Sequence, residues 1–161
     1  MNINEKGPAN VALIVLVVIL AGVAGYFALN NRSTTWQFID ANSFTLSLPP
    51  NWKFNELQGI DSYVGEFTGD GAKLGFDYGW YSNPLAEDND PNHTVTYETI
   101  DGHRAKIVIP KTFGNGITGV YFEDLGGGFQ KTRLEVSGYN LTASQQETAL
   151  KIFRTLKFKK Y

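Results

Sequence analysis

The densest group of potential oxygen ligands is the run 87–92, which reads Glu-Asp-Asn-Asp-Pro-Asn. Within it, Asp88, Asp90 and Asn92 have the spacing of the first three ligands in a Ca²⁺-binding loop. The later positions depart from that pattern, because His93 replaces the expected glycine and Thr99 replaces the expected glutamate. The run therefore predicts either a weak Ca²⁺ site or a solvated loop between two hairpins.

His93 and His103 are the only histidines, and the chain contains no cysteine. The two histidines fall at opposite ends of one expected hairpin, roughly 20–30 Å apart, which argues against a shared metal site. The serine motifs of hydrolases are absent, and the adjacent carboxylates Glu123 and Asp124 should point to opposite faces of a strand. We therefore expect no catalytic residue, no cofactor and no enzymatic activity. An envelope enzyme whose site is assembled from distant residues is an alternative.

The aromatic segment 79–85 leaves an alternating strand and enters a loop. Trp80 continues the apolar stripe of that strand, so we expect its side chain to be buried. Tyr81 and Leu85 fall beyond the stripe, and we expect them to be exposed and to form an edge that binds a protein partner.

The net charge of −2 conceals two halves of opposite sign. Residues 55–101 contain ten acids and one base, whereas residues 102–161 contain ten bases and four acids. We expect the halves to interleave in a sheet and neutralise one another, with electrostatic steering of a charged partner as the alternative. Nucleic-acid binding is not expected of an exported domain with a net negative charge.

The longest apolar run extends from Val11 to Leu29, with Leu20 near its centre, and contains no charged residue. As a helix it would span about 28 Å, close to the hydrocarbon thickness of a bilayer. The run therefore predicts a single-pass anchor in the cell membrane after a short tail at 1–10. The Lys and Arg balance leans slightly towards a cytoplasmic N-terminus, which places a linker at 30–35 and a domain at 36–161 outside the cytoplasm. The absence of cysteine is compatible with an exported bacterial protein.

Other interpretations of this run stay open. Small residues near its end would suit a cleaved signal peptide. Lys6-Gly7 before an apolar helix is typical of a pilin leader, although Ala12 replaces the usual glutamate, so a pilin-like filament subunit is a second hypothesis. Ala21 and Gly25, four residues apart, would allow two such helices to self-associate.

The domain itself alternates apolar and polar side chains with period two over 36–137, which predicts antiparallel strands. Glycine-containing turns at 69–71, 101–102 and 126–128 predict three hairpins, and the stretch from Trp52 to Gly59 can add a turn of helix. Thr142 and Gln145 have the spacing of a capping box, and apolar residues then recur at helical spacing over about 14 residues. The expected fold is α+β, with an antiparallel sheet of about seven or eight strands and a C-terminal amphipathic helix packed on it.

The stretch 43–52, which reads Ser-Phe-Thr-Leu-Ser-Leu-Pro-Pro-Asn-Trp, resembles the opening of PsbP-like domains. Asp101-Gly102 with Ala105 is similar to their central hairpin, and residues 156–158 are similar to their closing strand. The resemblance covers residues 36–159 and implies an α/β/α sandwich around an antiparallel sheet. It also implies a non-enzymatic binding or assembly factor, whose partner the sequence does not name.

Overall fold

The computed structural model describes residues 35–126 and 131–159, so the expected anchor at 11–29 and its small residues Ala21 and Gly25 lie outside the described residues. Within the described ranges, no helix is both long and apolar enough to cross a bilayer.

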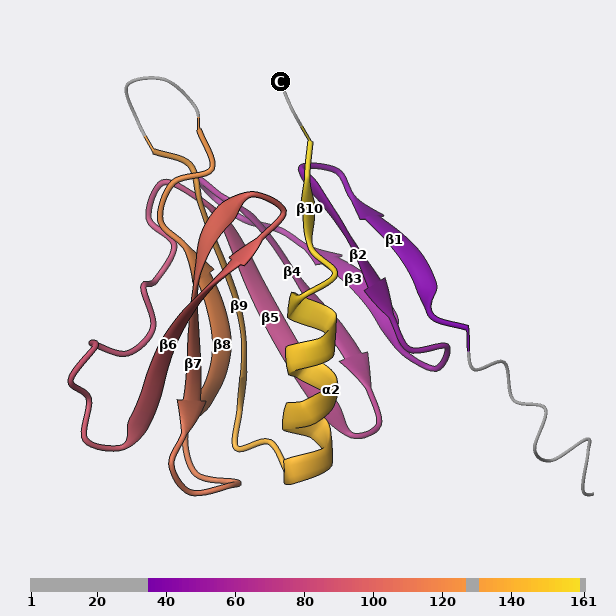
Figure 1. Cartoon of the computed structure of the whole chain (residues 1–161). Helices are drawn as coiled ribbons and strands as arrows, with labels where there is room; N and C mark the ends of the chain where they lie inside the picture. Colours follow the sequence, from indigo (N-terminus) through magenta and orange to yellow (C-terminus); the bar gives the residue numbers. More distant parts are fainter. Residues whose placement is uncertain (1–34, 127–130, 160–161) are drawn as a thin grey trace, which may run out of the picture. The chain divides into compact units, whose positions relative to one another are not determined.

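Two antiparallel sheets and one helix make up this part of the chain (Figure 1). The smaller sheet has three strands in the order β1 (Gln37–Ala41), β2 (Phe44–Leu48) and β10 (Lys157–Phe158). The helix is α2 (Ala143–Phe153). The larger sheet has seven strands, which follow in space the order β3 (Lys53–Leu57), β4 (Tyr63–Gly69), β5 (Ala72–Gly79), β9 (Arg133–Tyr139), β8 (Ile117–Phe122), β7 (His103–Pro110) and β6 (His93–Ile100).

Short turns set the register of two hairpins, as the sequence predicted. Asp101 and Gly102 have φ values of 50° and 82°, and they join β6 to β7 so that Ile100 lies opposite His103. Asp70 and Gly71 join β4 to β5 in the same way, with φ values of 51° and 71°. Two successive residues with positive φ give a turn whose twist matches that of the flanking strands. The third expected hairpin is also present as the pair β8 and β9.

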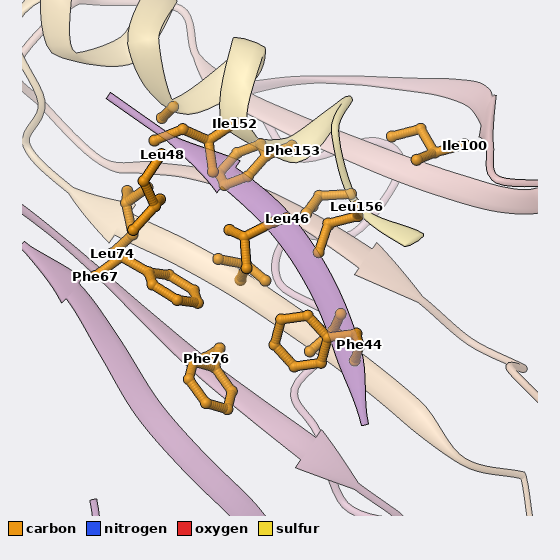
Figure 2. Close-up of a cluster of buried hydrophobic side chains, with 14 of the residues drawn as sticks. Phe44, Leu46, Leu48, Phe67, Leu74, Phe76, Ile100, Ile152, Phe153 and Leu156 are labelled. Carbon is orange, nitrogen blue, oxygen red and sulfur yellow. The ribbon is translucent and has the colours of Figure 1, made fainter. Parts of the chain in front are cut away.

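The hydrophobic core lies on the inner face of the larger sheet, which β2 and α2 cover. Phe44 of β2 meets Phe76 of β5 edge to face, with ring centroids 5.2 Å apart. Figure 2 shows Leu46 and Leu48 of β2 beside Ile152 and Phe153 of α2, above the side chains of β4 and β5. The helix contacts both β8 and β2, so segments from the two ends of the domain bury the same apolar face.

Both ends of α2 follow from local sequence. The Thr142 hydroxyl accepts the Gln145 backbone N–H, and the Gln145 side chain accepts the Thr142 N–H, which confirms the predicted capping box. The helix ends at Phe153, earlier than expected, and the chain then enters β10. Asp101 accepts the Phe158 N–H at 2.8 Å and the Lys157 ammonium at 3.1 Å, which fastens β10 to the β6–β7 turn.

Several sequence expectations need correction. The stretch after Trp52 forms strand β3 rather than a turn of helix, because it pairs with β4 along its length. Trp80 is 51% exposed rather than buried, because β5 ends at Gly79 and the alternation stops there. The sheet count is seven plus three strands rather than seven or eight in one sheet, and a single helix is present in the described ranges.

The two oppositely charged halves of the chain do interleave. Lys106 lies 3.6 Å from Asp88, and Arg154 lies 3.1 Å from Glu98. The Lys157–Asp101 pair at the β6–β7 turn also joins a base of the second half to an acid of the first. Exposed ion pairs contribute little stability each, but these three join acids of the first half of the chain to bases of the second.

Replacing Leu46 by Ala should lower the free energy of unfolding by about 2–5 kcal/mol, because the change opens a cavity between β2 and the larger sheet. The Leu46 side chain is 1% exposed. The measurement is denaturant unfolding of the full chain followed by near-ultraviolet circular dichroism.

The matched control is Leu57→Ala in β3, where the side chain is 49% exposed. Its effect should stay within about 0.5 kcal/mol. Equal losses for the two variants would contradict the assignment of β2 to the core.

Candidate functional site

The loop at 80–92 lies on the outer face of the larger sheet, opposite the core. Its two flanking strands, β5 and β6, are separated in the sheet by β9, β8 and β7, so the loop must cross those strands. A Cβ atom placed on Gly119 of β8 would lie only 2.7 Å from Leu85 Cδ1, so the glycine makes room for that side chain. Ser82 is buried at the start of the loop and donates to the Asp77 carbonyl at 2.8 Å.

The far end of the loop is held by His93. Its Nδ1 lies 2.9 Å from Asp90 Oδ1, and its Nε2 accepts the Ile117 backbone N–H at 3.1 Å. Because Nε2 accepts a backbone N–H, Nδ1 is the ring nitrogen placed to donate to Asp90. The same hydrogen bond from His93 is the main reason why the pKa of Asp90 is lowered. Both ends of the loop are thus fixed by specific polar contacts.

The residues of the predicted Ca²⁺ loop contact different groups of the protein. Asp88 accepts the Tyr97 hydroxyl at 2.7 Å and faces Lys106, and the Tyr97 hydrogen bond lowers the pKa of Asp88. Asp90 instead faces His93, while Asn92 is exposed. Across 35–126 and 131–159 no group of three or more His, Asp or Glu side chains could hold a metal ion. A weak Ca²⁺ site and a solvated loop therefore both stay predictions.

His93 and His103 lie at opposite ends of the β6–β7 hairpin, as the sequence indicated. His93 is paired with Pro110, and His103 is paired with Ile100 at the turn. The His103 ring packs edge to face on Phe158, with centroids 5.1 Å apart.

A hollow of about 430 Å³ opens on the outer face beside the loop, and we call it the cationic depression. Its volume falls within the usual range for a small-ligand site. Three of its lining residues are bases on β7 and β9. The full lining is Pro84, Tyr97, Arg104, Lys106, Tyr121, Glu123, Asp124 and Arg133.

The bases of the cationic depression differ in how far they are neutralised. Arg104 stacks its guanidinium 3.8 Å from the centre of the Tyr97 ring, and no carboxylate among the described residues forms an ion pair with it. Arg133 donates through Nη1 to the Trp80 carbonyl, and its buried Nε has no acceptor in the described part of the chain. Lys106 faces Asp88 at a loose 3.6 Å. Two guanidinium groups therefore retain unneutralised charge.

The two acids that line the cationic depression are already engaged. Glu123 pairs with Lys131 at 3.0 Å, and that hydrogen bond lowers the pKa of Glu123. Asp124 Oδ1 accepts the Gly126 backbone N–H at 2.9 Å. Neither carboxylate forms an ion pair with Arg104 or Arg133, although the pKa of Glu123 is also lowered by the charge of Arg133.

Tyr121 lines the cationic depression. It is 7% exposed, and its hydroxyl has no hydrogen-bond partner among residues 35–126 and 131–159. Burial raises the pKa of this hydroxyl, against the opposing effect of Arg133. The group is therefore protonated at neutral pH and is available as a hydrogen-bond donor.

An apolar surface adjoins the cationic depression at the end of β5. Ile60 is fully exposed, and it lines one shallow hollow of about 550 Å³ together with Trp80. Tyr81 follows in the chain and is 76% exposed. We call these three residues the aromatic patch. Because Arg133 lines the cationic depression and bonds to the Trp80 carbonyl, the two surfaces meet.

Sequence reasoning found part of this surface. Tyr81 is exposed as expected, whereas Leu85 is partly buried against Gly119. Ile60 was missed, although a single large apolar residue between Gly59 and Asp61 is a usable signal. The bases on β7 and β9 were missed because only the strand order brings them together.

A second hollow of about 560 Å³ on the outer face contains a pair of carboxylates. Asp77 of β5 and Glu135 of β9 are direct cross-strand neighbours. Burial is the main cause that raises the pKa of Glu135, and Asp77 raises it further. The Ser137 hydroxyl donates to Glu135 at 2.5 Å and opposes the rise.

The chain matches no protein-family model, no curated protein and no solved structure.

Replacing Glu135 by Gln should stabilise the protein increasingly as pH rises, because burial disfavours the ionised form of the wild-type carboxyl and raises its pKa. Because the pKa of Glu135 is higher in the folded state, this carboxyl adds to the free energy of unfolding at low pH. That stabilisation is present in full below the unfolded-state pKa of about 4.3 and is lost as pH rises through the folded-state pKa. The difference in unfolding free energy, variant minus wild type, should therefore increase with pH. Denaturant unfolding at several pH values measures it.

The control is Glu147→Gln on the exposed face of α2, where the hydrogen bond from Lys151 lowers the pKa of Glu147. The difference in unfolding free energy should change with pH in the opposite direction. The Glu147 carboxylate stabilises the protein above its unfolded-state pKa, and this stabilisation is lost as pH falls. The same pH trend in both variants would refute the assignment of Glu135 as a desolvated acid.

Proposed function

We propose that the protein is a membrane-anchored, extracytoplasmic binding or assembly module that acts without catalysis. In this proposal the apolar run 11–29 supplies the anchor, and the described domain holds a protein partner at the end of its sheet. The resemblance to PsbP-like domains supports a non-enzymatic role. The observation that carries the proposal is the junction of the aromatic patch with the cationic depression.

The aromatic patch has the composition of a protein-binding surface. Trp80 and Tyr81 belong to the residue types that most often dominate binding energy at interfaces, and both are largely exposed. Ile60 extends the apolar area beside Trp80. Burying these side chains against a partner would remove apolar surface from water, which favours association.

The loop that presents the patch is held before any partner arrives. Ser82 is anchored on β5, Leu85 packs on β8, and His93 ties the end of the loop to Ile117. A surface that is ordered in advance loses less conformational entropy on binding. The loop is therefore suited to present Trp80 and Tyr81 in one arrangement.

The partner's chemistry follows from the two adjoining surfaces. An apolar segment would cover the aromatic patch, and an acidic group next to it would lie over Arg104 and Arg133, which have no carboxylate partner in the described ranges. We therefore propose a protein segment that combines apolar side chains with at least one acidic group.

A photo-crosslinking amino acid at position 81 tests the proposal in the full chain in its native membrane. We expect a discrete protein adduct from this position. Adding Trp80→Ser should reduce the adduct about tenfold or more, because removing a central aromatic residue from an interface has an effect of this size.

The matched control carries the same crosslinker at Tyr139, which is 67% exposed at the opposite end of β9. It should give no such adduct. Identical adducts from both positions, or none from position 81, would refute a partner site at the aromatic patch.

A further inference from the structure

The cationic depression contains donors that the fold itself does not use. Arg104 has its guanidinium on the Tyr97 ring, which fixes its plane and leaves its N–H groups without a carboxylate in the described part of the chain. Arg133 is held from the other side by the Trp80 carbonyl. Stacking on an aromatic ring and bonding to a backbone carbonyl both leave positive charge uncompensated.

Tyr121 adds a neutral donor between these bases. A tyrosine presents an apolar ring and a polar tip that can donate a hydrogen bond. Here the residue as a whole is 7% exposed and lines the hollow, and its hydroxyl, which is not among the buried unpaired atoms, has no partner in the described part of the chain and is open to a ligand. Tyr121 of β8 lies directly opposite Lys106 on β7 and Glu135 on β9, and it lines the same hollow as Arg104 and Arg133.

We propose that the cationic depression binds an oxyanion, a carboxylate or a phosphate, through Arg104 and Arg133 with the Tyr121 hydroxyl as an additional donor. Arginine guanidinium groups bind such groups through paired N–H donors. The depression has room for a small ligand or for one acidic side chain. This inference rests on the proposed function, because both use the same end of the sheet. It adds the chemical group that this surface would bind.

The two lining acids limit which anions fit. Glu123 and Asp124 also line the depression, and both are tied to groups of the protein itself. They would repel an anion that extends towards them. The group bound is therefore a single anionic head that Arg104 and Arg133 hold.

The test titrates the full chain in detergent micelles, at low ionic strength, with inorganic phosphate, succinate and sodium chloride in separate experiments. The chain has four arginines, whose Nε–H groups give separate signals in a proton–nitrogen correlation spectrum. We expect saturable shifts of the Arg104 and Arg133 signals with phosphate, succinate or both. Arg154, which is already paired with Glu98 at 3.1 Å, serves as the internal control and should not shift.

Three variants test which side chains bind the anion. Tyr121→Phe keeps the ring and removes the donor, so it should weaken binding about 3–10-fold. Arg104→Gln should weaken binding about tenfold or more, since bonds to charged groups are stronger. Arg154→Gln is the matched control and should leave the affinity unchanged.

Each outcome decides between the possibilities. A response to phosphate alone identifies a phosphate site, and a response to succinate alone identifies a carboxylate site. Shifts that chloride reproduces equally, shifts that Arg104→Gln and Tyr121→Phe leave unchanged, or no saturable shift at millimolar anion would overturn the proposal. Because crosslinking at position 81 is measured separately, failure here would not be confused with failure of the partner site.

Discussion

The structure depends on covering the one apolar face of a seven-stranded antiparallel sheet. Strands β4, β5, β7, β8 and β9 all direct buried aliphatic and aromatic side chains to this face. Each such side chain is worth about 1.5–3 kcal/mol when it is removed from water. An uncovered sheet would lose that stabilisation, and β2 and α2 together provide the cover.

The cover is assembled from the two ends of the domain. Strand β2 comes before the large sheet in the chain, and α2 comes after it, while β10 returns to pair with β2. Pairing β10 with β2 joins the two covering segments to each other, and Asp101 joins β10 to the turn of the large sheet. The core is therefore closed by contacts that are distant in sequence, which is why it requires the whole domain.

The same constraint produces the candidate site on the other face. Apolar side chains of the strands turn inward, so their neighbours, among them Arg104, Lys106 and Arg133, turn outward. The strand order then separates β5 from β6 and makes the loop between them cross the outer face. The loop buries part of that face and leaves the cationic depression and the aromatic patch on either side of the contact between Arg133 and Trp80.

The amino-acid pattern by itself determined the local elements. Period-two alternation with two-residue turns predicted the β4–β5 and β6–β7 hairpins, because the twist of such turns is set by the residues at the turn. The capping box at Thr142 was likewise readable, since both of its hydrogen bonds lie within four residues. By contrast, the stretch after Trp52 was misread as a turn of helix, because its strand form depends on pairing with β4.

Tertiary structure alone decided which strands are neighbours, and with that it decided the site. Arg104 and Arg133 are far apart in the sequence, and they line one hollow only because β8 lies between β7 and β9. Trp80 continues an apolar stripe in sequence but is exposed, because the strand that carries the stripe ends one residue earlier. Local propensity acts over a few residues, whereas strand order and the end of a sheet depend on packing between segments that sequence spacing does not describe.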